Sequence, residues 1–203
     1  MELAKATLDV MPGKQEEIKL DPPTLRDLPP RKGSRPKTLG GPLHIQCSGH
    51  GDRKHIDQLV RDVLSWPHVE ALPDSNNPPT AVPIQFEENA ATLDSAPFIS
   101  AREFARVLLG APTIYLALPL VCAHWAIVRG WAEPHYLSSF GLLPAGAVVV
   151  YTPKDPDELS VCYALFHAAY HSAFAVKNRP AGTALPGMKS FSFPARLVTN
   201  AEA

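Results

Sequence analysis

The spacing of apolar residues predicts an amphipathic helix early in the chain. Between residues 52 and 65, apolar side chains recur three or four positions apart, at Ile56, Leu59, Val60, Val63 and Leu64. This spacing places them on one face of a helix. Asp52 or Ser48 can cap the first turn. Pro67 ends the helix, because the residue before a proline avoids helical backbone angles.

The pattern then changes to one that is typical of strands. Residues 82–88 alternate between apolar and polar side chains, as expected of a strand with one buried face. Residues 113–118, TIYLAL, have the β-branched and aromatic content that strands favour. Further strands are predicted at 69–72 and 147–151, and residues 98–109 suit either a strand or a short helix, of which the strand is favoured.

Two later helices are predicted from their start and stop signals. Pro119 suits the first turn of one helix, and Gly130 marks its C-terminal end. Asp155 and Pro156 open the last helix, whose first turn carries further acidic residues. Most of the predicted strands follow one another along the chain, with no helix between them, after the first predicted helix and before the other two. We therefore expect an α+β fold with a mainly antiparallel sheet of about four to six strands and helices packed on one face.

Proline is unevenly distributed and divides the chain into three parts. Residues 1–42 form a proline-rich N-terminal arm, and residues 179–203 form a tail of similar composition. Neither segment has enough apolar side chains to offset the entropy cost of ordering on its own. The folded domain is therefore predicted at 43–178, with the arm either free or extended along the domain.

Charge and composition exclude several classes of function. The 203 residues carry a net charge of −1, which gives no electrostatic attraction to nucleic acid or to an anionic membrane. A winged DNA-binding domain is disfavoured for the same reason. Three cysteines without close spacing are typical of reduced intracellular thiols. No apolar run is long enough to span a membrane, so we expect a soluble, cytoplasmic protein.

The sequence contains no strong metal or nucleotide motif. His167 and His171 have the spacing of two metal ligands on a helix, but no third ligand is evident, and a helix flank explains them more simply. No glycine-rich phosphate loop is present. We expect a small-molecule substrate and no metal.

The side chains best suited to ligand binding and proton transfer lie close together at residues 131–135. Trp131, Glu133 and His135 lie within five residues, which is enough to bind and protonate a small organic molecule. The same residues also suit an ordinary turn between a helix and a strand. Because imidazole titrates near neutral pH, His135 is a candidate acid or base, and its action predicts a limb near neutrality in a pH–rate profile.

The adjacent residues Arg102 and Glu103 form a second candidate. If residues 98–109 are a strand, the two side chains point to opposite faces. One of them then faces inward, where an ion needs a partner. Either this group lies in a substrate site or both side chains reach water at a strand edge.

Five segments, in order along the chain, resemble the fungal bioluminescence luciferase family and its wider group of luciferase-like proteins. They are RDLPPRKGSRPK at 26–37, SWPHVEALP at 65–73, ISAREFARVLL at 99–109, TIYLALPLVCAHWAIVRGWAEPHYL at 113–137 and VVVYTPKDPDEL at 148–159. The resemblance extends over roughly residues 26–176. It includes an Arg-Glu strand, a tryptophan-containing turn with a histidine, and a tyrosine at a strand end.

The resemblance implies an enzyme that oxidises a hispidin-type pyrone with molecular oxygen and needs no metal, flavin or nucleotide cofactor. In such chemistry a base removes a proton from an electron-rich enol, and an arginine or histidine stabilises the developing anion in a dry pocket. By position in the matching segments, His135 and Glu103 are the expected acid–base residues and Tyr115 is the expected hydrogen-bond donor. The expected substrate-binding residues are Arg102 as the anion stabiliser, Trp131 as a stacking wall, Tyr151, and the arm residues Arg31 and Arg35.

The chain also departs from the family pattern and leaves two functions open. Family members typically carry histidines shortly after the Arg-Glu pair, whereas residues 105–109 here read ARVLL, and Tyr115 stands where the family strand often has histidine. The first function is a cofactor-independent enzyme of fungal secondary metabolism. It would act on a polyketide- or pyrone-like molecule by acid–base cyclisation, isomerisation or oxygen addition. The second is a non-catalytic small-molecule-binding or accessory protein that kept the fold.

Overall fold

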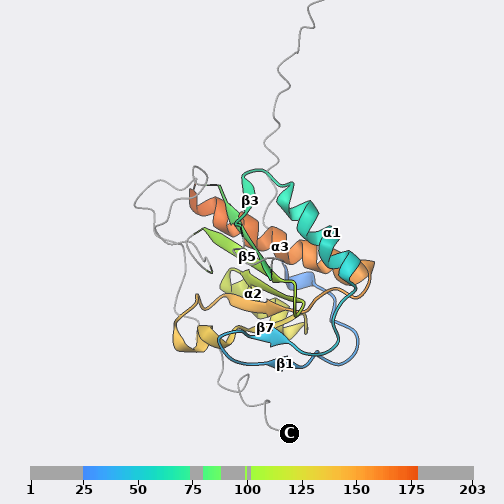
Figure 1. Ribbon diagram of the computed structural model, residues 1–203. Helices are drawn as coiled ribbons and strands as arrows, with labels where there is room; N and C mark the ends of the chain where they lie inside the picture. Colours follow the sequence, from blue (N-terminus) through green and yellow to red (C-terminus); the bar gives the residue numbers. More distant parts are fainter. Residues whose placement is uncertain (1–24, 74–79, 88–98, 100–101, 178–203) are drawn as a thin grey trace, which may run out of the picture.

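A six-stranded antiparallel sheet organises the structure (Figure 1). The computed structural model describes residues 25–73, 80–87, 99 and 102–177. In spatial order the strands are β3 (Val69–Ala71), β4 (Ala81–Phe86), β5 (Glu103–Leu108), β6 (Thr113–Ala117), β8 (Ala147–Val150) and β7 (Ala132–Pro134). Each neighbouring pair is antiparallel. The predicted α+β class with an antiparallel sheet is confirmed.

Three helices pack against one face of this sheet (Figure 1). They are α1 (Arg53–Leu64), α2 (Leu120–Val128) and α3 (Pro156–Lys177). Asp52 caps α1 by accepting a hydrogen bond from the backbone N–H of Lys54, and the carboxylate of Asp155 accepts from the N–H of Glu158 in α3. Helices and sheet share one apolar core, which includes Ile56, Leu59, Ile127, Leu165 and Phe166 from the helices and Ile84, Val107, Ile114, Leu116, Val148 and Val150 from the strands.

The other face of the sheet carries polar side chains. Residues directly opposite each other on antiparallel strands point to the same face. Arg106 of β5 lies opposite Tyr115 of β6, Tyr115 lies opposite Val149 of β8, and Val149 lies opposite Glu133 of β7. Because buried polar groups need hydrogen-bond partners, this second face requires a cover that can supply them.

A two-stranded sheet supplies part of that cover. Its strands are β1 (Thr38–Leu39) and β2 (Ile45–Gln46). Thr38 donates a hydrogen bond to Glu133, and the side-chain oxygen of Gln46 accepts one from the backbone N–H of Thr152 at 3.1 Å. The hairpin is thus attached to the second face through polar contacts to residues far away in the sequence.

A bulge in β5 changes which side chains share a face. Gln85 pairs with Glu103, but its neighbour Ile84 pairs with Ala105, so Phe104 is an extra residue on β5. Phe104 and Ala105 are both fully buried in the core on the helix side. Glu103 therefore lies on the same face as Arg106, although a spacing of three residues in a regular strand would separate them.

The region around residues 129–146 differs from the prediction of an ordered turn. It holds β7 and the 3₁₀ helix η3 (Tyr136–Phe140). β7 is only three residues long and ends in Pro134, which is tolerated because β7 is the edge strand. The sequence pattern also does not predict β1 and β2, which are two residues each. The predicted helices at 52–65 and after Pro119 and Asp155 are confirmed.

Part of the proline-rich arm lies along the domain. Leu25 and Leu28 belong to the apolar core, and the backbone N–H of Arg31 donates to the carbonyl oxygen of Arg129 at 2.8 Å. The rest of the arm, residues 1–24, and the predicted tail at 179–203 lie outside the described residues. Within the described part of the chain, none of the helices combines the length and hydrophobicity needed to cross a bilayer.

Gly146 marks a close approach between two backbone segments. A Cβ atom at this position would lie 1.9 Å from the carbonyl oxygen of Leu118. We therefore expect Gly146→Ala to lower the free energy of unfolding by about 2 kcal/mol or more, because backbone atoms must move to admit the methyl group. Gly110→Ala is the control, since no atom lies within 4 Å of its Cβ position. Equal urea midpoints for the two variants would contradict this interpretation.

Candidate functional site

Two buried polar rings meet on the second face of the sheet. Tyr115 on β6 is 6% exposed, and His135, directly after β7, is 2% exposed. Their ring centroids lie 4.8 Å apart and their planes are nearly perpendicular, at 88°. The buried hydroxyl of Tyr115 has no hydrogen-bond partner among the described residues. Such a hydroxyl costs about 1–3 kcal/mol when it stays unpaired, so Tyr115 has the capacity for one further hydrogen bond.

His135 is held as a neutral hydrogen-bond donor. The backbone N–H of Leu137 donates to its Nδ1 at 3.2 Å, so the neutral ring carries its proton on Nε2. Burial, and secondarily the nearby His44, lower the pKa of His135 to about 4. The expectation of a titration limb near neutrality is therefore wrong for this residue, because desolvation disfavours the imidazolium.

Glu133 lies at the centre of a hydrogen-bond network. Its carboxylate accepts hydrogen bonds from the hydroxyl of Tyr151 at 2.9 Å, from Nε2 of His44 at 2.6 Å and from Thr38. Burial acts to raise the pKa of Glu133, but these hydrogen bonds together outweigh it and the pKa lies below its ordinary value. Glu133 therefore stays ionised and ties the hairpin to β7 and β8.

His44 is locked in one orientation by this network. Its Nδ1 accepts a hydrogen bond from the backbone N–H of Tyr136 at 3.0 Å, so Nε2 carries the proton that is donated to Glu133. The rings of His44 and His135 lie 5.5 Å apart. His44 thus connects the carboxylate network to the Tyr115–His135 pair.

Glu103 is the inward-facing member of the Arg102-Glu103 pair. Its fully buried carboxylate accepts hydrogen bonds from Nε and Nη2 of Arg106 at 2.6 and 2.7 Å. Arg102 lies elsewhere, with its Nη1 3.9 Å from Oε1 of Glu70 on β3. The arginine directly across from Tyr115 is therefore Arg106, and the guanidinium of Arg102 pairs instead with a carboxylate on β3.

Arg31 anchors the arm between two aromatic rings. Its guanidinium carbon lies 5.9 Å from the ring of Trp131 and 5.5 Å from that of Tyr151. One of its nitrogens lies 3.2 Å from the carboxylate of Glu158. Both cation–π contacts and the ion pair are buried, where they are worth more than at an exposed surface. Tyr151 therefore links the arm to Glu133: its ring lies against Arg31, and its hydroxyl donates to the carboxylate of Glu133.

Trp131 and Arg35 hold the arm in the same way. The indole N–H of Trp131 donates to the carbonyl oxygen of Pro29 at 2.6 Å. Arg35 donates to the carbonyl oxygen of Ile127, at the end of α2, at 2.9 Å. In the structure, these predicted substrate-binding residues all make contacts that fix the arm.

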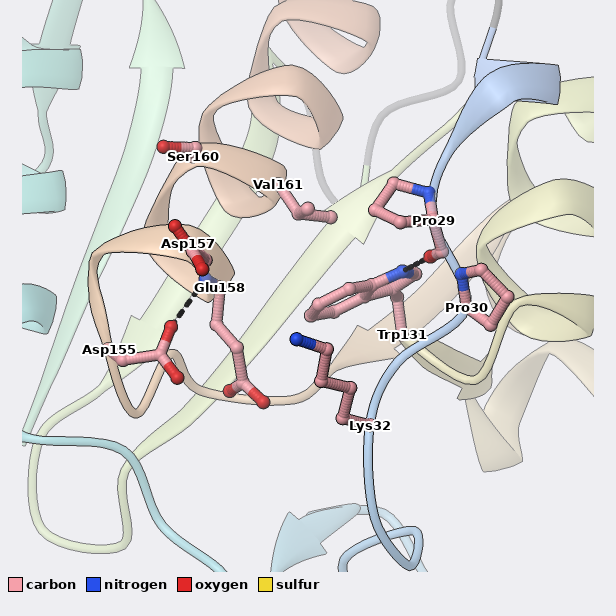
Figure 2. A pocket seen from close by; sticks show the side chains of 9 residues that line it. All are labelled: Pro29, Pro30, Lys32, Trp131, Asp155, Asp157, Glu158, Ser160 and Val161. Atoms are coloured by element: carbon pink, nitrogen blue, oxygen red, sulfur yellow. Dashed lines mark hydrogen bonds between the residues drawn. The ribbon is translucent and has the colours of Figure 1, made fainter.

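A cavity of about 420 Å³ opens where the arm crosses the start of α3 (Figure 2). Its lining comprises Pro29, Pro30, Lys32, Trp131, Asp155, Asp157, Glu158, Ser160 and Val161. In Figure 2 the side chain of Lys32 extends toward the space between Trp131 and Glu158. Trp131 is the one predicted site residue in this lining; Tyr115 and His135 do not take part in it. The cavity and the Tyr115–His135 pair are therefore separate features.

Three residues of the polar face were missed by sequence reasoning: Thr38, His44 and Arg106. Arg106 has a signal in the sequence, since it follows Glu103 by three residues, but a regular strand would place the two on opposite faces. Thr38 and His44 have no local signal, because their partner Glu133 is about 90 residues away.

The paired histidines on α3 pack as aromatic rings. His167 stacks on Trp66 with ring centroids 4.2 Å apart and lies 5.9 Å from the ring of His171. In the residues that the structure describes, no group of three or more histidine, cysteine, aspartate or glutamate side chains is arranged to hold a metal ion.

A family model described as a luciferase domain matches residues 102–169. This segment is about a third of the chain and runs from the start of β5 into α3. The resemblance to luciferase-like proteins is confirmed over it, and the segment contains Glu103, Tyr115 and His135. The hairpin with Thr38 and His44 lies outside the match. Neither the curated proteins nor the solved structures contain a match to the chain.

The lowered pKa of His135 predicts a pH dependence of stability. The unfolded chain binds a proton on this imidazole below about pH 6.5, whereas the folded chain binds it only below about pH 4. Stability from this group is therefore complete above pH 6.5 and is lost as the pH falls toward 4. Between pH 7 and pH 5 we expect the free energy of unfolding to fall by at most about 2 kcal/mol because of His135.

Urea unfolding of the wild type and His135→Gln at both pH values measures this contribution. Other groups titrate in both proteins, so the difference between their two pH dependences isolates His135. An identical loss of stability in the two proteins would show that the folded imidazole titrates normally.

Proposed function

Since its central segment matches a luciferase domain, we propose that the chain is a cofactor-independent enzyme of fungal secondary metabolism. Its substrate is a polyketide- or pyrone-like molecule with an enol or an enolisable carbonyl group. The reaction is a proton-driven cyclisation or isomerisation, or the addition of molecular oxygen to the enolate. The Tyr115–His135 pair is the proposed catalytic centre.

The unpartnered hydroxyl of Tyr115 is the observation that carries the proposal. It is buried beside a neutral imidazole whose Nε2 carries a proton. Two hydrogen-bond donors side by side, in a place from which water is largely excluded, suit an oxygen atom on which negative charge develops. Burial also raises the pKa of Tyr115, so the phenol keeps its proton and remains a donor.

Each residue of the polar face then has a role in the proposed reaction. Tyr115 and His135 donate hydrogen bonds to the substrate oxygen and stabilise the negative charge that develops on it, and each keeps its own proton. Glu133 and His44 act as positioning residues, because they hold η3 and the hairpin on either side of His135. Trp131, Tyr151, Arg31 and Arg35 support the site by fixing the arm, which is a different role from the direct substrate contact expected from the sequence.

A non-catalytic binding or accessory protein is the alternative. The same two donors can hold a polar organic molecule without converting it, and the histidines absent after the Arg-Glu pair favour this function. The two functions differ in one respect: the enzyme loses turnover when a donor is removed but retains part of its binding, whereas a binding protein shows no turnover in any variant.

Turnover of hispidin by the wild type, Tyr115→Phe and His135→Gln tests the proposal. Ring chemistry is followed by absorbance and oxygen uptake by an electrode. We expect each variant to lose about a hundredfold or more in kcat, because an oxyanion-stabilising donor contributes that much. Tyr163→Phe is the control, since its hydroxyl bonds to Asp62 on α1, away from the polar face.

Two results would overturn the proposed catalytic centre. One is unchanged kcat in both Tyr115→Phe and His135→Gln. The other is an equal loss of kcat in Tyr163→Phe, which would point to a general effect on the fold. If hispidin and simpler hydroxypyrones bind the wild type but none is converted, the binding function is the correct one.

A further inference from the structure

Most of the exposed large apolar side chains in the described part of the chain gather on one surface. Eight such side chains are exposed there, and five of them belong to the hairpin or to η3 and the turn that follows it. These five, which we call the apolar patch, are Leu39, Leu43, Tyr136, Phe140 and Leu142, with exposed fractions between 42% and 70%. Single exposed apolar side chains are ordinary, but a contiguous group marks an interaction surface.

Contacts between the hairpin and η3 make the patch contiguous. A Cβ atom at Gly40, in the turn of the hairpin, would lie 3.5 Å from Cδ2 of Tyr136, so this turn lies beside η3 (Figure 1). The rings of Tyr136 and Phe140 lie 5.0 Å apart. Leu142 is tied to the same helix, since its backbone N–H donates to the carbonyl oxygen of Leu137 at 3.1 Å. The hairpin and η3 therefore form one surface.

The two turns that carry the patch have an unusual composition. Surface turns ordinarily combine glycine or proline with polar side chains. In the hairpin, residues 40–42 read Gly-Gly-Pro, and an exposed leucine stands on each side of them. After η3, Gly141 adopts a φ of 68° and also stands between two exposed apolar residues. The glycines provide the backbone freedom that the turns require, and the folded monomer leaves their large apolar neighbours uncovered.

The segments that form the patch carry no formal charge. Residues 38–46 and 134–147 contain no aspartate, glutamate, lysine or arginine. The centres of protein interfaces are likewise poor in charged side chains and rich in tyrosine and phenylalanine. A surface that binds an anionic membrane, by contrast, gathers lysine and arginine among or beside its apolar side chains. The composition therefore favours a partner surface that is also protein and also free of charge.

We propose that the apolar patch is the interface of a symmetric homodimer, in which the patch packs on the same patch of a second copy of the chain. A charge-free surface suits itself as a partner, because no like charges meet across the two-fold axis. A standard interface buries roughly 800 Å² on each partner. At their exposed fractions, the five side chains provide roughly 100 Å² or more each, which is more than half of that area.

The same two elements that carry the patch also hold the polar network. The backbone N–H of Tyr136 donates to Nδ1 of His44, whose Nε2 lies 2.6 Å from the carboxylate of Glu133. The backbone N–H of Leu137 donates to His135. A second copy packed on the patch therefore restrains the hairpin and η3 against each other. The inference concerns assembly and does not depend on the proposed reaction.

Sedimentation velocity of the full chain, from about 1 to 100 μM, tests the dimer in the range where weak interfaces associate. The wild type should reach the mass of two chains at the upper end. Leu43→Ser and Phe140→Ser should each raise the dissociation constant of the dimer about tenfold or more, because the side chain is lost from both halves of the interface. Val121→Ser on α2 is the matched control, since Val121 is 69% exposed, as is Leu43. It should dissociate as the wild type does.

A charge exchange at one position tests whether the patch meets itself. Leu43→Lys and Leu43→Glu should each be monomeric alone, because like charges then meet within one small interface. An equimolar mixture of the two variants should associate more tightly than either variant alone. If the wild type dimerises and the mixture gains nothing, the patch packs on a different surface of the second copy, and the symmetric interface is wrong.

Hydrogen exchange at low and high protein concentration locates the interface without any substitution. Backbone N–H groups that the second copy covers or restrains exchange more slowly. We expect slower exchange at high concentration for residues 39–44 and 136–142, and equal exchange at both concentrations for residues 121–128. Slower exchange in α2 with no change in the hairpin and η3 would place the interface elsewhere and contradict the inference.

Three further results would overturn the dimer. One is a wild type that stays monomeric over the whole concentration range. Another is a dimer that Leu43→Ser and Phe140→Ser leave as stable as in Val121→Ser. The third is a monomer that binds vesicles of phosphatidylserine and phosphatidylcholine and loses this binding in Leu43→Ser and Phe140→Ser, which would assign the patch to a lipid surface.

Discussion

The polar face of the sheet depends on one buried carboxylate. Glu133 sits on the edge strand β7, and an ionised group at such a place is costly unless hydrogen bonds replace the water it loses. Thr38, His44 and Tyr151 supply them. The same contacts fix the hairpin, orient the imidazole of His44 and hold the end of β8. The position of His135 beside His44 follows from this network, and its neutral state follows chiefly from its burial there.

The sheet as a whole has two faces with different physical tasks. One face buries aliphatic side chains against three helices and supplies the hydrophobic stabilisation. The other buries a small number of polar groups, each of which needs a defined partner. Burying such polar groups without partners would lower the stability of the fold. The bulge at Phe104 helps to supply one partner, because it places Glu103 on the same face as Arg106, with which it pairs.

The arm connects the start of α3 with the residues next to the polar face. Arg31 lies against Trp131 and Tyr151 and pairs with Glu158 at the start of α3, while Tyr151 also bonds to Glu133. Tyr151 therefore contacts both the arm and the polar face.

The sequence by itself determined the elements whose signals are local. The apolar spacing of α1, the caps at Asp52 and Asp155, and the alternation in β4 predict the helices, the strands and the α+β class, because each depends on residues within one or two turns or a single strand. Glu103, Tyr115 and His135 could also be named in advance as candidates. Tertiary structure alone decided that Glu103 shares a face with Arg106, because a bulge is set by pairing between strands and not by the local pattern. It also decided the partnership of Thr38 and His44 with Glu133, which spans about 90 residues of sequence, and the acid-shifted titration of His135, which arises from burial that only the folded chain creates.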